Sequence, residues 1–394
     1  MLRIADRSSC APRGLSIIEV LFSMGIIAVG LLGVLTILPV AGVRTTRGLI
    51  RDTADRMGRN AIRQFDVRGM ARPNTWTRYS PSEQTYRAIP PWPSGHPIHS
   101  RSFCIDPLFV ATHAARETEF AAIEYFPYYP PDHPDRDTRM QRISLQNFPG
   151  VDTGMSLAAA MEIFSSQDDL VFDLPDDPTF PPLQNFSDLQ TRRQAMGRFS
   201  WLATLTPKQH LQAIWDDGAT DYGDSYILSI VVFHDRDMSM NVEDPDPENT
   251  LWETYGPANE RVLDVLIPHM GFAGGDVVLR TRPDRPLQDL DIRPGNWVML
   301  STRIPTTPEH LHFFRWYHVV GADGGVDLAP GGEEGEGPWE RNVSLHGSDW
   351  DLFVGLVDEF PDANLRTQAT VLNNVVAVYE KTVRLETSSL WTAR

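Results

Sequence analysis

Residues 14–43 read GLSIIEVLFSMGIIAVGLLGVLTILPVAGV, and this stretch decides the expected fold. From residue 15 onward it carries a single charge, Glu19, and the uncharged part from residue 20 is long enough to cross a hydrocarbon layer of ~30 Å as a helix. We therefore predict a membrane-spanning helix over residues 15–43. A cleaved secretory signal is the alternative, but its apolar region normally spans only about 7–15 residues.

A short polar leader, residues 1–14, precedes the apolar run and ends at Gly14. Glu19 lies five residues after that glycine. A carboxylate inside an apolar helix costs about 2–3 kcal/mol, so it favours a cationic partner. Cleavage after Gly14 would create such a partner, because the new α-amino group of Leu15 on a neighbouring subunit could pair with Glu19.

The combination of a basic leader ending in glycine, a carboxylate at the fifth following position and a long apolar run resembles the processing signal of type IV prepilins and type II secretion pseudopilins. It looks most like the minor pilins of the pilus-modification type. The resemblance implies that prepilin peptidase cleaves between Gly14 and Leu15, that Leu15 is N-methylated, and that Glu19 forms an assembly salt bridge. Two departures are Leu15, where the family usually has phenylalanine, and the helix proline, which lies at Pro39.

The function that the resemblance implies is a minor pilin or pseudopilin subunit, assembled into a type IV pilus or a type II secretion pseudopilus. The implied partners are prepilin peptidase, other pilins or pseudopilins, an inner-membrane assembly platform, and membrane lipid before assembly. The implied location is a single pass through the inner membrane, with a cytoplasmic N-terminus and a periplasmic head. The arginines after the apolar run would favour the reverse orientation by charge alone, but long domains translocate largely regardless of charge.

The expected fold class is α+β, with a long N-terminal membrane-spanning helix followed by a large β-rich globular head. Apolar residues at steps of three and four predict an amphipathic helix extension over residues 44–70. This extension could pack between subunits of a filament or against its own sheet. The head is expected over residues 74–394, with two subdomains, 74–205 and 226–394, as one possible division.

Short apolar segments bounded by proline and glycine predict strands through most of the head. The expected strands are 121–125, 199–205, 226–233, 261–267, 277–279, 297–300, 313–320 and 370–385. A helix is predicted at 156–164, and residues 287–320 resemble a small barrel or meander whose aromatic side chains are expected in the core. The glycine-rich stretch 321–338 is expected to form no core.

Composition argues against several classes of function. The 52 acidic residues exceed the 35 basic ones and give a net charge of −17, so a basic footprint for nucleic acid is absent. Two cysteines are too few for a disulfide framework and lack zinc-site spacing, and Cys104 is expected to be a small buried residue. Common hydrolase and nucleotide-binding motifs are missing. We expect no enzymatic activity and no cofactor; the alternative is an uncleaved, signal-anchored periplasmic enzyme or binding protein.

Three groups of side chains are candidate ligands or catalytic residues. Asp244, Asp246 and Glu248 alternate like the start of a calcium loop, but the turn glycine and the twelfth-position glutamate are missing, which favours solvated charge. His310 and His312 have the spacing that places two side chains on one face of a strand, where they could bind a metal. The neighbours His234 and Asp235 could form a catalytic pair or simply end a strand. For both histidine groups the structural interpretation is favoured.

Overall fold

The computed structural model describes most of the chain, with gaps at the N-terminus, at the C-terminus and in several loops. The described residues are 16–89, 101–114, 123–129, 138–146, 153–166, 170–172, 193–195, 198–208, 225–242, 254–257, 259–271, 273–283, 285–304, 311–333, 337–350 and 366–386. The chain separates into two compact units, Met1–Asp52 and Thr53–Arg394. Each unit is described by itself below.

The N-terminal helix α1 (Ile17–Val67) begins inside the apolar run and continues well past it. Within the described residues, no helix combines the length and the apolar character needed to cross a membrane. The predicted membrane-spanning helix over residues 15–43 and the predicted single-pass inner-membrane location are therefore wrong.

The last third of α1 belongs to the second unit and packs against it. Four apolar side chains at helical spacing are buried there: Ala54, Met57, Ala61 and Phe65. Gly58 faces the ring of Tyr379, and Lys381 Nζ lies 2.7 Å from Asp66 Oδ2. The helix face that carries these four residues therefore packs against the chain's own sheet, which is one of the two arrangements predicted for the extension. The helix ends before Gly69, whose φ of +63° is readily adopted only by glycine.

One large sheet holds most of the strands from the first part of the second unit. Its strands are β1 (Trp76–Ser80), β2 (Thr85–Ala88), β3 (Phe103–Ile105), β4 (Tyr125–Phe126), β5 (Met140–Leu145), β8 (Phe199–Pro207), β9 (Ser225–His234) and β19 (Val375–Arg384). Their order is β19-β9-β8-β3-β5-β1-β2, with β4 also paired to β5. The β3–β5 pair is parallel and the other pairs are antiparallel. A short 3-10 helix, η1 (Pro73–Thr75), leads into β1.

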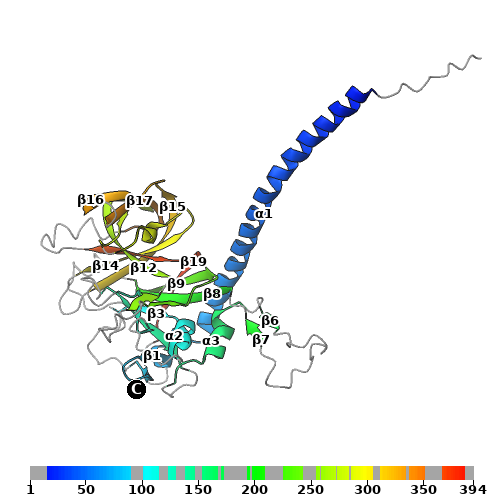
Figure 1. The fold of residues 1–394 in the computed structure, drawn as a ribbon. Coiled ribbons are helices and arrows are strands. Elements are labelled where there is room, and N and C mark those ends of the chain that lie inside the picture. The colour runs from blue at the N-terminus through cyan, green and yellow to red at the C-terminus, as the bar shows by residue number, and fades with distance from the viewer. Residues whose placement is uncertain are drawn as a thin grey trace, which may run out of the picture. The chain divides into compact units, whose positions relative to one another are not determined.

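Strand β8 is buried on both faces, which explains its nearly continuous apolar sequence. On one face Trp201 stacks against Phe164 of α3 (Leu157–Phe164), with ring centroids 4.3 Å apart. Figure 1 shows α2 (Pro107–Ala114) and α3 on the same side of this sheet. The predicted helix at 156–164 is thus confirmed, and Ser156 caps it by accepting a hydrogen bond from the Ala159 amide.

The second group of strands closes into a six-stranded barrel. It consists of β12 (Glu260–Gly271), β13 (Gly274–Arg280), β14 (Trp297–Ile304), β15 (Leu311–Ala322), β17 (Gly337–Gly347) and β18 (Thr367–Leu372). The order β13-β12-β18-β14-β15-β17 is closed by pairing of β13 with β17. Strand β16 (Asp327–Glu333) pairs with the first residues of β17, and η5 (Leu287–Leu290) precedes β14. Two further two-stranded sheets are β6 (Leu170–Phe172) with β7 (Arg193–Ala195), and β10 (Met240–Val242) with β11 (Thr254–Pro257).

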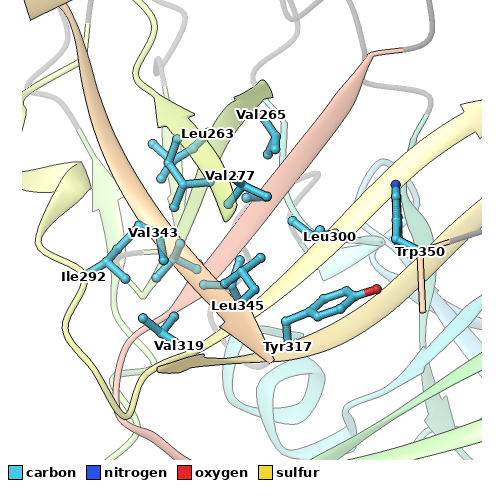
Figure 2. Close-up of a cluster of buried hydrophobic side chains, with 14 of the residues drawn as sticks. Leu263, Val265, Val277, Ile292, Leu300, Tyr317, Val319, Val343, Leu345 and Trp350 are labelled. Atoms are coloured by element: carbon cyan, nitrogen blue, oxygen red, sulfur yellow. The ribbon is translucent and has the colours of Figure 1, made fainter. Parts of the chain in front are cut away.

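Aliphatic and aromatic side chains fill the inside of the barrel. Figure 2 shows this cluster, which includes Leu263, Val277, Leu300, Tyr317 and Val343 from five different strands. The aromatics of the 297–320 region are largely core residues, as predicted. The stretch 321–338 was expected to form no core; β16 pairs there with β17, and most of its side chains are exposed, with Ala329 buried.

A second apolar cluster joins the barrel to the large sheet. Leu202, Val231 and Phe233 come from the sheet, while Phe314 and Trp316 come from the outer side of the barrel. The indole Nε1 of Trp316 donates to the Thr204 hydroxyl at 3.2 Å. The two layers therefore share one core within the second unit.

The fold is mainly β within the described residues, and the predicted α+β class with a membrane-spanning helix is wrong. The fold is mainly β because the short apolar segments pair with one another as strands, in the large sheet and in the closed barrel. Most of the core is therefore formed by side chains from strands.

Strands β9 and β19 are neighbours in the large sheet, although all barrel strands lie between them in the sequence. Val375 is opposite Phe233, and the amide of His234 donates to the carbonyl of Asn374 at 3.0 Å. Only Asn373 and Asn374 separate β18 of the barrel from β19 of the sheet.

Candidate functional site

Four charged side chains meet in the interior between the large sheet and the barrel. Asp106 directly precedes α2, Arg142 lies on β5, Arg236 follows β9, and Glu260 is the first residue of β12. Their side chains are at most 1% exposed. We call these four residues the buried ion cluster.

Arg142 links the two carboxylates of the cluster. Its Nη2 donates to Oε1 of Glu260, and its Nη1 lies 3.6 Å from Oδ2 of Asp106. The other oxygen of Glu260 accepts the Tyr128 amide at 3.0 Å. The guanidinium carbon of Arg142 is 4.0 Å from the centroid of the Phe109 ring, which is within cation–π range. This side chain therefore connects the sheet to the first barrel strand.

Arg236 and Asp106 form the second half of the cluster. Nη1 and Nη2 of Arg236 donate to Oδ1 and Oδ2 of Asp106 at 2.9 and 2.6 Å, a two-bond geometry that fits the guanidinium fork. Asp106 Oδ1 also accepts the amide of Phe109 at 3.4 Å, as a residue capping the start of α2 does. The same carboxylate thus stabilises a helix end and a buried cation.

The electrostatics of the cluster are set by its own members. Burial by itself would raise the pKa of Asp106, but attraction to Arg236, hydrogen bonds from Arg236 and the charge of Arg142 outweigh it and hold that pKa below its ordinary value. Burial also opposes the charge on Arg142, yet Glu260 and Asp106 outweigh it and raise the pKa of Arg142. Two cations and two anions therefore balance one another away from water.

The arrangement serves packing rather than turnover. Each carboxylate is already engaged by an arginine, so neither is available as a general base. Cys104 is buried and free, as predicted, and burial followed by the nearby Asp106 charge raises the pKa of its thiol well above the ordinary value. A protonated, inaccessible thiol is a poor nucleophile.

The low pKa of Asp106 predicts a dependence of stability on acidity. The unfolded carboxyl titrates near 3.9, so the stabilising contribution of Asp106 is complete above about pH 4 and is lost as pH falls through the lower, folded-state pKa. The urea concentration at the unfolding midpoint, measured from pH 6 to pH 2, should therefore fall below about pH 4. The Asp106→Asn variant should be less stable than the unaltered chain at pH 6, and its midpoint should fall less on acidification. An equal acid slope in both proteins would contradict this assignment.

A second feature lies in the first unit, at the start of α1. Glu19 is exposed in the first helical turn. Large apolar side chains around it and after it are also exposed, among them Ile17 at 81%, Phe22 at 73% and Val29 at 75%. We call α1 residues 17–35 the apolar segment. Because these side chains occur at successive positions, they cover all sides of the helix.

Several residues predicted as site residues lie outside the described part of the chain. These are Gly14, Leu15, Asp244, Asp246, Glu248 and His310. Among the residues that are described, no group of three or more histidine, cysteine, aspartate or glutamate side chains could hold a metal ion. His234 Nδ1 lies 3.3 Å from Asp235 Oδ2 beside the end of β9, and His312 lies on β15.

The buried ion cluster was not predicted from the sequence. Its members are separated by between 24 and 154 positions, and no local motif connects them. A weak signal existed in Arg142, the single charge in the strand segment Met140–Leu145. A buried charge in a strand requires an opposite charge from elsewhere in the fold.

Comparison of the chain with models of protein families, with curated protein sequences and with solved structures finds no match.

Proposed function

We propose that the chain is a minor pilin or pseudopilin subunit that works by assembly with other subunits through the apolar segment of α1. The observation that carries the proposal is a helix whose start exposes large apolar side chains on all sides, with a single carboxylate in its first turn. A helix that is apolar all round is normally buried among other elements. Helices of neighbouring subunits in a filament would provide that burial.

The expected driving force is large. Fully burying one leucine, isoleucine or phenylalanine side chain is worth about 1.5–3 kcal/mol. Nine such side chains on the apolar segment are more than half exposed in the isolated chain, including Leu21, Ile26, Ile27 and Leu32. Packing them between subunits would outweigh the cost of ordering several chains together.

Glu19 would set the register of neighbouring subunits. The proposal follows the resemblance of residues 14–43: prepilin peptidase cleaves after Gly14, and the methylated amino group of Leu15 on one subunit pairs with Glu19 of the next. A carboxylate among apolar helices is costly without a cation, so wrongly shifted neighbours are disfavoured. The pairing therefore selects one axial offset between helices.

The first test is the mass of the N-terminal peptide of the native protein. The proposal expects a chain that begins with N-methylated Leu15. A native chain that retains Met1 and the complete first fourteen residues would refute processing and, with it, this function.

The second test is the Glu19→Gln variant, which keeps the shape of the side chain and removes its charge. We expect normal leader cleavage and a filament content lowered about tenfold or more, as expected for an unpaired ammonium group left inside a helix bundle. Glu19→Asp, which keeps the charge, is the matched control and should assemble better than Glu19→Gln. Equal incorporation of Glu19→Gln and the unaltered chain would contradict the pairing.

A further inference from the structure

Three arginines follow the apolar segment on α1 within a stretch that has no acidic residue. Arg44, Arg47 and Arg51 are all exposed. Between Glu19 and Asp52 the sequence contains no aspartate or glutamate. We call these three residues the arginine stripe.

Helical geometry places the arginine stripe on one side of α1. Spacings of three and four residues bring side chains to the same face of an α-helix. Gly48 lies among the three arginines, and a Cβ added to it would meet nothing within 4 Å. A partner can therefore approach the helix closely between the guanidinium groups.

The charges later on α1 differ, because they are matched by opposite charges within the same unit. Arg59 pairs with Asp55, and Asp66 pairs with Lys381. Next to the arginine stripe, the hydroxyls of Thr45 and Thr46 donate to carbonyls of their own helix, at Ala41 and Gly42. Among the described residues, no ion pair is formed by the three guanidinium groups of the stripe. These guanidinium groups are therefore available to bind another molecule.

We propose that the arginine stripe binds the acidic surface of a second copy of this chain, which deepens and rests on the proposed assembly through α1. The whole chain has a net charge of −17, and this basic stretch contributes none of the acidic excess. Copies brought together by their apolar segments would repel one another unless positive charge lies between them. Guanidinium groups bind carboxylates through paired hydrogen bonds, which suits such a contact.

The contact must be short in range, because charges separated by more than ~8 Å are screened at physiological ionic strength. The stripe begins nine residues after the apolar segment, about 14 Å farther along the same helix. The contact therefore requires a neighbour that is packed along this whole stretch of α1 and places its acidic side chains beside the arginines. The apolar segment would supply most of the affinity, and the stripe would select the side of the helix on which the acidic neighbour lies.

The experiment uses two differently tagged copies of the full chain and measures how much of one co-purifies with the other. The triple variant R44E/R47E/R51E should lower capture about tenfold, the loss expected for three exposed ion pairs that are each worth little. The matched variant R44K/R47K/R51K keeps the charge and should retain most of the capture. Raising the salt from 0.1 to about 0.5 M should weaken the unaltered chain towards the level of the triple variant.

Three outcomes separate this proposal from its alternatives. Unchanged capture by the triple variant, while Glu19→Gln lowers capture, overturns the stripe and leaves the proposed function intact. No capture of the unaltered chain at any salt concentration overturns the proposed function as well. Binding to vesicles of phosphatidylserine and phosphatidylcholine that is lost in the triple variant, with capture unchanged, assigns the stripe to phosphate groups and refutes the protein partner.

Discussion

Replacing Arg142 by methionine is expected to lower the free energy of unfolding by about 3–5 kcal/mol. Arg142 is completely buried and is the link between Asp106 and Glu260. Without its guanidinium group, the charge of Glu260 stays in the interior with the Tyr128 amide as its remaining hydrogen-bond donor among the described residues. The measurement is urea unfolding at pH 7, followed by the tryptophan fluorescence of the second unit.

The double variant Arg142→Met/Glu260→Leu provides the control for this loss. It removes both charges of one pair and leaves the two-bond contact of Arg236 with Asp106 in place. Replacing a buried ion pair by apolar side chains is often neutral or stabilising, so we expect the double variant to recover at least half of the lost stability. A single variant that costs less than about 1 kcal/mol would show that the pair does not hold the sheet and the barrel together.

The second large effect is expected from Trp316→Ala, with a loss of about 3–5 kcal/mol. The ring is 4% exposed in the core shared by the sheet and the barrel, so truncation leaves a cavity between the two layers. It also leaves the Thr204 hydroxyl without the indole donor. Thermal unfolding measured by circular dichroism at two wavelengths tests both the loss and its cooperativity.

Trp316→Phe separates the two parts of this effect. Phenylalanine keeps most of the ring volume and loses the hydrogen bond, so its cost should be about 1–2 kcal/mol. Similar losses in the alanine and phenylalanine variants would mean that the hydrogen bond, and not the packing, dominates. A loss below about 1 kcal/mol in Trp316→Ala would contradict a shared core.

Local features of the fold could be predicted from the sequence because their causes are local. The helix α3 was predicted from its apolar spacing, and β8, β9 and the barrel strands other than β17 were predicted from short apolar segments between turn residues. Strands β18 and β19 were predicted as one strand, 370–385, and β1, β2, β3 and β5 were not predicted. The helical extension was predicted from its three- and four-residue spacing, and its buried face, including Ala61 and Phe65, is the one observed. Each of these features depends on neighbours within a few positions.

Features that depend on pairing across long distances could not be predicted. Closure of the barrel needs β13 beside β17, and no residue of either strand specifies that neighbour by itself. No strand was predicted in the glycine-rich segment 321–338, but β17 supplies the partner strand for β16. The buried ion cluster likewise exists only because the fold brings four distant charges together.

The apolar run at the N-terminus led to the wrong location and the wrong fold class for a different reason. Hydropathy measures how poorly a segment is solvated by water, but it does not say whether lipid, the protein core or a neighbouring subunit buries that segment. Lipid was the environment predicted for the run, and the fold class was then inferred from one helix and not from the many strands. Glu19, in the first turn of α1, stays a predicted assembly residue, whereas Gly14 and Leu15, the two residues of the predicted cleavage site, lie outside the described residues.

The neighbouring positions of β9 and β19 have a consequence for the modular construction of the second unit. Residues 235–374, which include the whole barrel, leave and re-enter the large sheet at one place, between His234 and Val375. Residues 235–374 are thus an insertion between the two strands of a single β-hairpin, β9 and β19. A tight turn could join these two strands without altering their alignment. A chain shortened in this way would keep its strand order but uncover Leu202, Val231 and Phe233. The barrel therefore covers this apolar face of the sheet. A chain without the barrel would need other apolar side chains to bury these three residues.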